Sequence, residues 1–376
     1  MQTIQITADA RDRFKRGATL ALLHRAGLEG GQANEFSGAN LQSLARDYLH
    51  MAGASAAYAD PKQLVGAALG MTRVSMSGGM HSTSDFVEIL ANVANKSMLK
   101  GYGEVEETFP LWTAKGSLQN FKPEKRVDLN LFPALAEVLE GAEYTSGTMG
   151  NRGETIQLAT YGKAFGISRQ AIINDDLNCF TRVPRFMGRA AKRTIGNLVY
   201  SGLTANADMS DSIDLFHADH GNLALSGAAP DVTSLDAGRA AMAKQRDPDG
   251  HAAGGLNIRP KFFIVPVALQ GRASVLMSAE KDPSATNQNS SKPNHVAGMA
   301  TVVSDARLDA ASVTAWYLAA DPNSTDTVEV AYLNGNESPM LDQMDGWKVD
   351  GVEFKVRIDA GVKPLDFRGL YKNAGQ

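Results

Sequence analysis

The closest grouping of residues that could hold a metal ion is His217, Asp219 and His220, in the segment HADH. Two histidines three residues apart, with a carboxylate between them, could supply ligands to one ion. The sequence contains no second histidine pair, no HExxH motif and no cysteine ligand to complete such a site. The pattern therefore favours hydrogen-bonding groups that fix a loop, and we expect no metal and no other cofactor.

The remaining reactive residue types form no catalytic pattern. Asp175–Asp176 and Glu106–Glu107 are paired acids without an obvious base, and the first pair suits the positive end of a helix. The chain has no GxSxG motif, no P-loop and no GxGxxG after a strand. Cys179 is the single cysteine, which indicates a small buried side chain in a reducing compartment. We expect a protein that is not an enzyme.

Thr181–Leu203 carries a row of basic side chains and predicts one long helix, here called the spine helix. Thr181 would cap its first turn, and Pro184 would lie inside that turn. Apolar residues fall on one side: Val183, Met187, Ala190, Ala191, Ile195 and Leu198. Basic residues fall on the other, within roughly 100°: Arg182, Arg185, Arg189, Lys192 and Arg193. This stripe is either a solvated face or one that meets a polyanion or acidic neighbours.

Length and composition describe an ordinary globular protein. The 376 residues exceed one typical core, so we expect two or more subdomains. A net charge of −4 argues against a nucleic-acid reader with a basic surface throughout. No apolar run reaches the ~18 residues of a membrane span, and the N-terminus lacks a signal-peptide core. We expect no membrane contact and no export through a signal of its own.

The first hundred residues read as helices. Residues 1–36 suggest a loosely tethered arm, with a helix over 8–26 that Gly17 interrupts. Further helices are expected over 40–52 and 61–69, and another after Asp85, which can cap it.

Residues 107–167 predict a two-stranded arm. An extended segment anchored by Phe109 and Trp112 leads to a turn-rich tip, and Thr155–Ile167 returns as a strand that bends at a glycine. A two-stranded ribbon is marginal when isolated, so we expect it to lie on a neighbouring subunit.

The rest of the chain mixes helices and strands. Ser168 can cap a short helix, and Thr233 or Ser234 a helix over 233–245. A buried strand at 261–266 between two helices indicates a small layered domain. Further strands are expected at 300–303, 315–319 and 328–332. Val352–Ile358 alternates apolar and charged residues, as a strand with one buried face does. We infer that it shares a domain with the spine helix and that residues 232–334 are inserted between them.

Three blocks carry a resemblance to a known family: KPEKRVDLNLFPALAEVLEGAEY (122–144), ETIQLATYGKAFGISRQAIINDDL (154–177) and LFHADHGNLA (215–224). Together they resemble major capsid proteins of tailed bacteriophages, and most of all the Mu-like major head subunits, which also occur as prohead-protease–capsid fusions. No protease domain lies within this chain. The resemblance singles out no lysine–asparagine pair for a subunit crosslink.

The resemblance implies an α+β, HK97-like capsid fold. Its parts would be an N-terminal arm with helices (1–84), an extended β-ribbon or E-loop (119–167), a P-domain with the spine helix, and an inserted A-domain (232–334). The P-domain would combine residues 85–118, 168–231 and 335–376.

The implied function is that of a major head protein whose pentamers and hexamers close into an icosahedral shell around double-stranded DNA. Its partners would be other copies, a portal, scaffold or prohead protease, a decoration protein, and packaged DNA by non-specific contact. It would assemble in the bacterial host cytoplasm and reside in the virion capsid. The residues that we expect at subunit interfaces are Lys125, Arg126, Glu137, Glu140, Glu143 and Arg152. Two alternatives stay open, an encapsulin-like nanocompartment shell and a metal-dependent enzyme using His217, Asp219 and His220.

Overall fold

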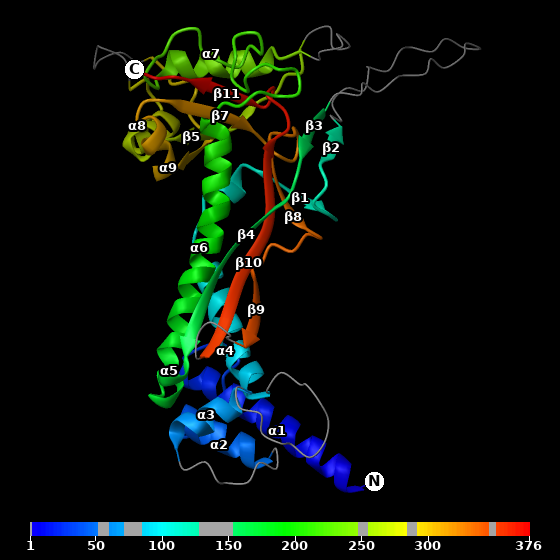
Figure 1. The fold of residues 1–376 in the computed structure, drawn as a ribbon. Coiled ribbons are helices and arrows are strands. Elements are labelled where there is room, and N and C mark those ends of the chain that lie inside the picture. The colour runs from blue at the N-terminus through cyan, green and yellow to red at the C-terminus, as the bar shows by residue number, and fades with distance from the viewer. Residues whose placement is uncertain are drawn as a thin grey trace, which may run out of the picture. The chain divides into compact units, whose positions relative to one another are not determined.

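The computed structural model describes residues 2–51, 60–70, 85–127, 153–246, 255–283, 292–345 and 351–376. The chain forms two compact units. Unit 1 comprises residues 1–106, 160–194 and 337–359, and unit 2 comprises residues 107–159, 195–336 and 360–376. Helices and strands occur in both units, which confirms the expected α+β class (Figure 1). None of the described helices combines the length and apolarity of a membrane span.

Unit 1 consists mainly of helices. These are α1 (Gln2–Arg25), α2 (Leu41–Met51), α3 (Pro61–Ala68), α4 (Asp85–Gly103), α5 (Arg169–Ile173) and the first part of α6 (Leu177–Thr204). The strands are β4 (Ala159–Ser168), β9 (Met340–Asp345) and the first part of β10 (Gly351–Pro364), which has β4 as a neighbour. β9 and β10 pair antiparallel, from Val352↔Asp345 to Arg357↔Met340.

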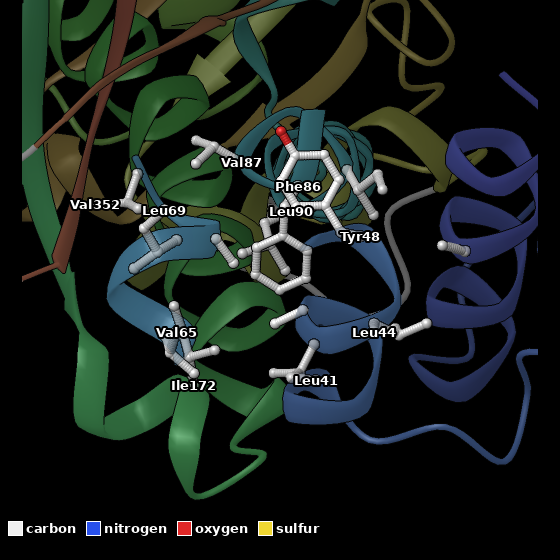
Figure 2. Packing of buried hydrophobic residues seen from close by; sticks show 14 of the residues in the cluster. Leu41, Leu44, Tyr48, Val65, Leu69, Phe86, Val87, Leu90, Ile172 and Val352 are labelled. Carbon is white, nitrogen blue, oxygen red and sulfur yellow. The ribbon is translucent and has the colours of Figure 1, made fainter. Parts of the chain in front are cut away.

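The core of unit 1 lies where α2, α3, α4 and α5 meet, as Figure 2 shows. Phe86 and Leu90 of α4 are fully buried there, and Tyr48 of α2 stacks on Phe86 with ring centroids 6.3 Å apart. The predicted alternation of β10 is confirmed, because Val352, Phe354, Val356 and Ile358 are all buried.

The N-terminal segment is more firmly held than we expected. α1 runs through Gly17 without interruption, and a β-carbon at this position would overlap the ring of Phe36. Phe14, Ala18, Leu22 and Leu23 are buried in the core of unit 1. The prediction of a loosely tethered arm is therefore wrong for this part of α1, because the apolar residues along one of its faces pack against the rest of unit 1.

The spine helix is confirmed as α6, but its predicted start is wrong. It begins at Leu177, four residues before Thr181, and Pro184 lies inside it. Asp176 accepts a hydrogen bond from Asn178 N at 3.1 Å, so this acid, and not Thr181, serves the first turn. The Thr181 hydroxyl instead donates to Leu177 O.

Unit 2 contains two separate sheets and a ribbon. The four-stranded sheet, β11-β7-β5-β6, consists of β11 (Leu370–Asn373), β7 (Trp316–Ala320), β5 (Pro260–Val265) and β6 (Thr301–Ser304). β5 pairs parallel with β6 and antiparallel with β7. All five residues of β7 are buried, so both faces of this sheet are covered. The helices and 3₁₀ turns of this part are α7 (Val232–Ala243), η3 (Val267–Leu269), α8 (Gln270–Ser278) and α9 (Ala306–Ala311).

The residue predicted to cap α7, Thr233 or Ser234, is wrong. Asp231 occupies the N-cap and accepts from Ser234 N, while the Ser234 hydroxyl accepts from Asp231 N. This reciprocal capping box satisfies two backbone donors, which a cap at Thr233 or Ser234 would not do.

The second sheet of unit 2 brings together segments far apart in the sequence. β1 (Ala114–Leu118) pairs parallel with β8 (Val328–Leu333), and residues 360–364 of β10 pair antiparallel with β8. Just before β1, the turn η1 (Phe109–Leu111) leads to Trp112, and both predicted anchors, Phe109 and Trp112, are buried.

The described base of the expected arm is a two-stranded ribbon. β2 (Glu124–Val127) and β3 (Gly153–Ile156) pair antiparallel, from Glu124↔Ile156 to Val127↔Gly153. The predicted returning strand is two strands, β3 and β4, separated by Gln157 and Leu158.

Candidate interaction surfaces

The residues considered as metal ligands do not converge on one point. His220 is buried, with Nδ1 3.2 Å from Leu215 O and Nε2 3.0 Å from Asp211 Oδ2. Its ring also stacks on Phe367 at a centroid distance of 3.8 Å. Both ring nitrogens therefore face protein oxygens, and His217 bonds separately with Asp219. Within the described ranges no group of three or more His, Cys, Asp or Glu is placed to hold a metal ion.

The loop interpretation fits this arrangement. Asn222 Nδ2 donates to Leu215 O at 2.7 Å, the same carbonyl that His220 faces, and the Asn222 side-chain oxygen accepts from His217 N. The HADH segment thus holds its own turn through hydrogen bonds, as the sequence indicated.

α4 and α6 approach each other closely in unit 1, through two glycines. A β-carbon at Gly101 would overlap Arg185 O, and one at Gly188 would overlap Met98 O. Ser97 Oγ also donates to Thr181 O at 2.5 Å. Because neither glycine has a side chain, the two helix backbones come into direct contact.

This contact changes which face of α6 is buried. Pro184 and Gly188 lie on the buried line, whereas Val183 is 39% exposed and Ala190 is also exposed. The predicted apolar face is therefore wrong at these two positions, although Ala191 and Ile195 are buried as expected. The periodicity of apolar side chains gives no sign of Gly101 and Gly188, the residues at which the backbones of α4 and α6 come into contact.

Two members of the predicted basic stripe share one carboxylate that the sequence reasoning missed. Arg185 Nε donates to Glu104 Oε2 at 2.8 Å, and Arg189 Nη2 donates to the same oxygen at 2.6 Å. These hydrogen bonds lower the pKa of Glu104 to about 2. Glu104 directly follows α4, so only the packing of α4 against α6 brings it to the arginines.

The other stripe residues lie around this cluster. Lys192 sits over the Tyr102 ring, 5.1 Å from its centroid, while Arg182 and Arg193 are exposed. Lys96 and Lys100, about two turns and one turn before Glu104, are exposed as well. We call these seven cations the α4–α6 basic face: Lys96, Lys100, Arg182, Arg185, Arg189, Lys192 and Arg193.

Beside this face, α6 borders a hollow of about 430 Å³ on its apolar side. Met187 and Ala190 of α6, Tyr161 of β4, and Val356 and Ile358 of β10 line it. All of these residues belong to unit 1.

The predicted interface residues are placed only in part. Arg126 on β2 is bound within its own chain, with Nη2 2.8 Å from Glu329 Oε1 and 3.0 Å from Ser117 O. Lys125 on the same strand is exposed. Four of the residues lie outside the described part of the chain: Glu137, Glu140, Glu143 and Arg152.

Comparison with known proteins gives a family match. A family model described as phage capsid protein matches residues 153–373. This range contains the blocks 154–177 and 215–224 on which the resemblance was based, but not the block 122–144. A comparison with curated proteins returned no match.

Solved structures were also compared. The procapsid of bacteriophage JBD30 is 15% identical, with 78% of this chain and 77% of that chain covered and a TM-score of 0.44. A Microbacterium phage Oxtober96 structure is 8% identical, with 73% of this chain and 93% of that chain covered and a TM-score of 0.44. A virus-like particle from Pyrococcus furiosus is 11% identical, with 75% of this chain and 98% of that chain covered and a TM-score of 0.40.

Proposed function

The chain belongs to the phage capsid protein family, and we propose that its copies form pentamers and hexamers that close into an icosahedral shell around double-stranded DNA. The observation that carries the proposal is the family match over residues 153–373, which includes all of α6 and every strand from β3 to β11. As a member of this family the protein is a structural component of the virion capsid and not an enzyme.

We propose an HK97-like division of the chain, with an arm at 1–84, an E-loop at 119–167 and an A-domain inserted within 232–334. The P-domain would combine 85–118, 168–231 and 335–376. β5, β6 and β7 share a sheet with β11, whereas β8 joins β1 and β10. This supports placing the core of the A-domain in residues 232–320, with β11 added from the C-terminal part of the chain.

We propose that the ribbon at 119–167 lies across an adjacent copy, where Lys125 and Arg152 meet Glu137, Glu140 or Glu143. Exposed ion pairs contribute at most ~1 kcal/mol each, so they matter through repetition over many subunits. Arg126 belongs to the same proposed interface, and it also has a second role. It fixes the base of the ribbon to Glu329 within its own chain.

We further propose that the protein belongs to the Mu-like subgroup and assembles in the bacterial host cytoplasm. A portal and a scaffold or prohead protease would take part in assembly, and a decoration protein could bind the finished shell. The family match over residues 153–373 is the support for these proposed partners.

Negative-stain electron microscopy of the purified full-length protein tests the proposed function. We expect closed particles of uniform diameter built from rings of five and six subunits. Compact monomers at all concentrations in the analytical ultracentrifuge would overturn the proposal. If the particles enclose an enzyme and contain no nuclease-protected DNA, the nanocompartment alternative is correct.

A ribbon variant sharpens this test. Val127 and Gly153 form the last described pair of the ribbon, so residues 128–152 can be replaced by Asn-Gly, which suits a two-residue hairpin turn. We expect this variant to keep its circular dichroism spectrum and melting temperature but to form no shells. The control replaces the Ser/Asn tract 284–291 by a Gly/Ser segment of equal length, and it should still assemble.

A further inference from the structure

We propose that the α4–α6 basic face binds the phosphate backbone of double-stranded DNA, and that Glu104 weakens this binding by occupying Arg185 and Arg189. The inference rests on the proposed function, which places DNA inside the shell. It adds to that function a defined contact surface and an internal competitor for the same cations.

The cations of α6 form a row that suits a regularly charged rod. Arg182, Arg185, Arg189 and Arg193 follow one another at intervals of three or four residues. With a rise of 1.5 Å per residue, the row extends about 16 Å along the helix axis. DNA carries a charge about every 3.4 Å along each strand, so a row of this length can meet several phosphates.

Glu104 occupies the centre of this row in the way that a phosphate would. A carboxylate that receives two guanidinium groups satisfies the same charged, forked donors that arginine offers to a phosphate. The Glu104 side chain is 26% exposed, and those of Arg185 and Arg189 are 41% and 32% exposed. A competing anion can therefore reach the cluster from solvent.

The composition of the surface favours DNA over an acidic protein as the partner. Seven cations lie on α4 and α6, and the carboxylate at their centre is Glu104, while Glu29 lines the neighbouring hollow beside Lys96 and Lys100. Lysine and arginine heads on two helices supply charge, and none of the seven cations lines the apolar hollow at Met187 and Ala190. Such a surface suits contacts with phosphates, which carry no sequence information, and we expect binding without sequence preference.

The experiment measures the affinity of unassembled full-length protein for a fluorescent 30-base-pair duplex over a range of salt concentrations. Glu104→Gln is compared with Glu106→Gln, which removes the same charge from an exposed position two residues away. We expect Glu104→Gln to bind at least about threefold more tightly at low salt than Glu106→Gln. Its slope of log K against log salt should steepen by up to about 1.8, the value for two additional phosphates.

A second variant removes cations from the same surface, whereas Glu104→Gln removes an anion. Lys96→Gln/Arg182→Gln removes two exposed cations and should weaken binding, with a slope shallower by up to about 1.8. Melting temperatures within a few degrees of the wild type show that each variant is folded.

Equal affinities of Glu104→Gln and Glu106→Gln would overturn the role of Glu104. Binding of polyglutamate, which would be the probe for an acidic protein, without binding of the duplex would overturn the DNA assignment. Microscopy separates these failures from that of the proposed function. Closed shells from a protein that fails the DNA test refute only this inference, whereas an absence of shells refutes the proposed function.

Discussion

Arg126 and Glu329, 203 residues apart in the sequence, form a forked ion pair in unit 2. Arg126 Nη2 lies 2.8 Å from Glu329 Oε1, and Nε lies 3.1 Å from Oε2. The Glu329 side chain is only 9% exposed, and Gly116 leaves room for it, since a β-carbon there would overlap the carboxylate. This pair connects the ribbon strand β2 to β8 in the neighbouring sheet.

Arg126→Gln should therefore destabilise the protein by about 2–3 kcal/mol, because it leaves a buried carboxylate without its cation. Chemical denaturation measures this change in the free energy of unfolding. Lys122→Ala, an exposed position near the same ribbon, is the control and should change stability by less than about 0.5 kcal/mol. Equal effects of the two variants would contradict a structural role for the pair.

Gly188 and Gly202 lie on the same helix but should respond to alanine in opposite directions. At Gly188 the new methyl group would overlap the α4 backbone, so Gly188→Ala should destabilise by about 1–3 kcal/mol or more. At Gly202 no atom lies within 4 Å, so Gly202→Ala should stabilise by about 0.5–1 kcal/mol through helix propensity. Thermal unfolding of both variants gives the signs, and a stable Gly188→Ala protein would argue against the close contact of α4 and α6.

The features that the sequence predicted correctly are those that depend on residues close together in the chain. The alternation of Val352 to Ile358 identified β10 because a strand with one buried face has a period of two. The turn formed by the HADH segment was also predictable, because its hydrogen bonds join residues close in sequence. The presence of the spine helix followed in the same way from its two faces.

Long-range pairing was not predictable from one sequence. Glu104 reaches Arg185 and Arg189 only because glycines at 101 and 188 bring two helices together. Neither glycine has a side chain that could signal a contact in a periodicity analysis. The ion pair of Arg126 was missed for the same reason, since its partner Glu329 lies in a strand near the other end of the chain.

Asp175 joins three segments of unit 1 and supports another prediction. Its carboxylate accepts from Leu41 N at 2.7 Å, at the start of α2, and from Arg25 Nη2 at 2.6 Å. Its φ of 52° lies in the left-handed region, which aspartate and asparagine tolerate better than alanine.

Asp175→Ala should accordingly destabilise by about 2–3 kcal/mol, from a lost helix cap, a lost ion pair and backbone strain. Asp175→Asn should lose less, because it retains an oxygen acceptor and tolerates the left-handed conformation. Asp47→Ala, at an exposed position of α2, is the control in denaturant titrations. If alanine and asparagine at 175 behaved alike, the hydrogen bonds would not be the source of stability.

Glu104 should make stability depend on acid pH. Its pKa in the folded protein is about 2, lowered from 4.5 by hydrogen bonds from Arg185 and Arg189. Because the folded pKa is the lower one, this contribution is present above pH ~4.5 and is lost as the pH falls toward 2. The stability difference between wild type and Glu104→Gln should shrink over that interval, as urea unfolding at a series of pH values would measure. A difference independent of pH would show that the carboxylate is not ionised preferentially in the folded state.

Tyr200 should make the stability of the protein fall as the pH rises in the alkaline range. The Trp112 indole donates to the Tyr200 hydroxyl, which bonds to Thr108 at 2.5 Å, and Thr108 in turn donates to Asp305 at 2.7 Å. Burial of the ring raises the pKa of Tyr200 to about 12. Because the folded pKa is above the unfolded value of 10, stability is present below pH ~10 and is lost as the pH rises through 12.

Tyr200→Phe should destabilise at neutral pH by about 1–3 kcal/mol, because it leaves the buried Trp112 N–H without its acceptor. The same variant should lose less stability than the wild type between pH 10 and 12, since it removes a group that must ionise on unfolding. Tyr161→Phe, at a half-buried position in β4, is the control and should shift neither quantity appreciably. Parallel alkaline stability curves for wild type and Tyr200→Phe would mean that the buried hydroxyl does not resist ionisation in the folded chain.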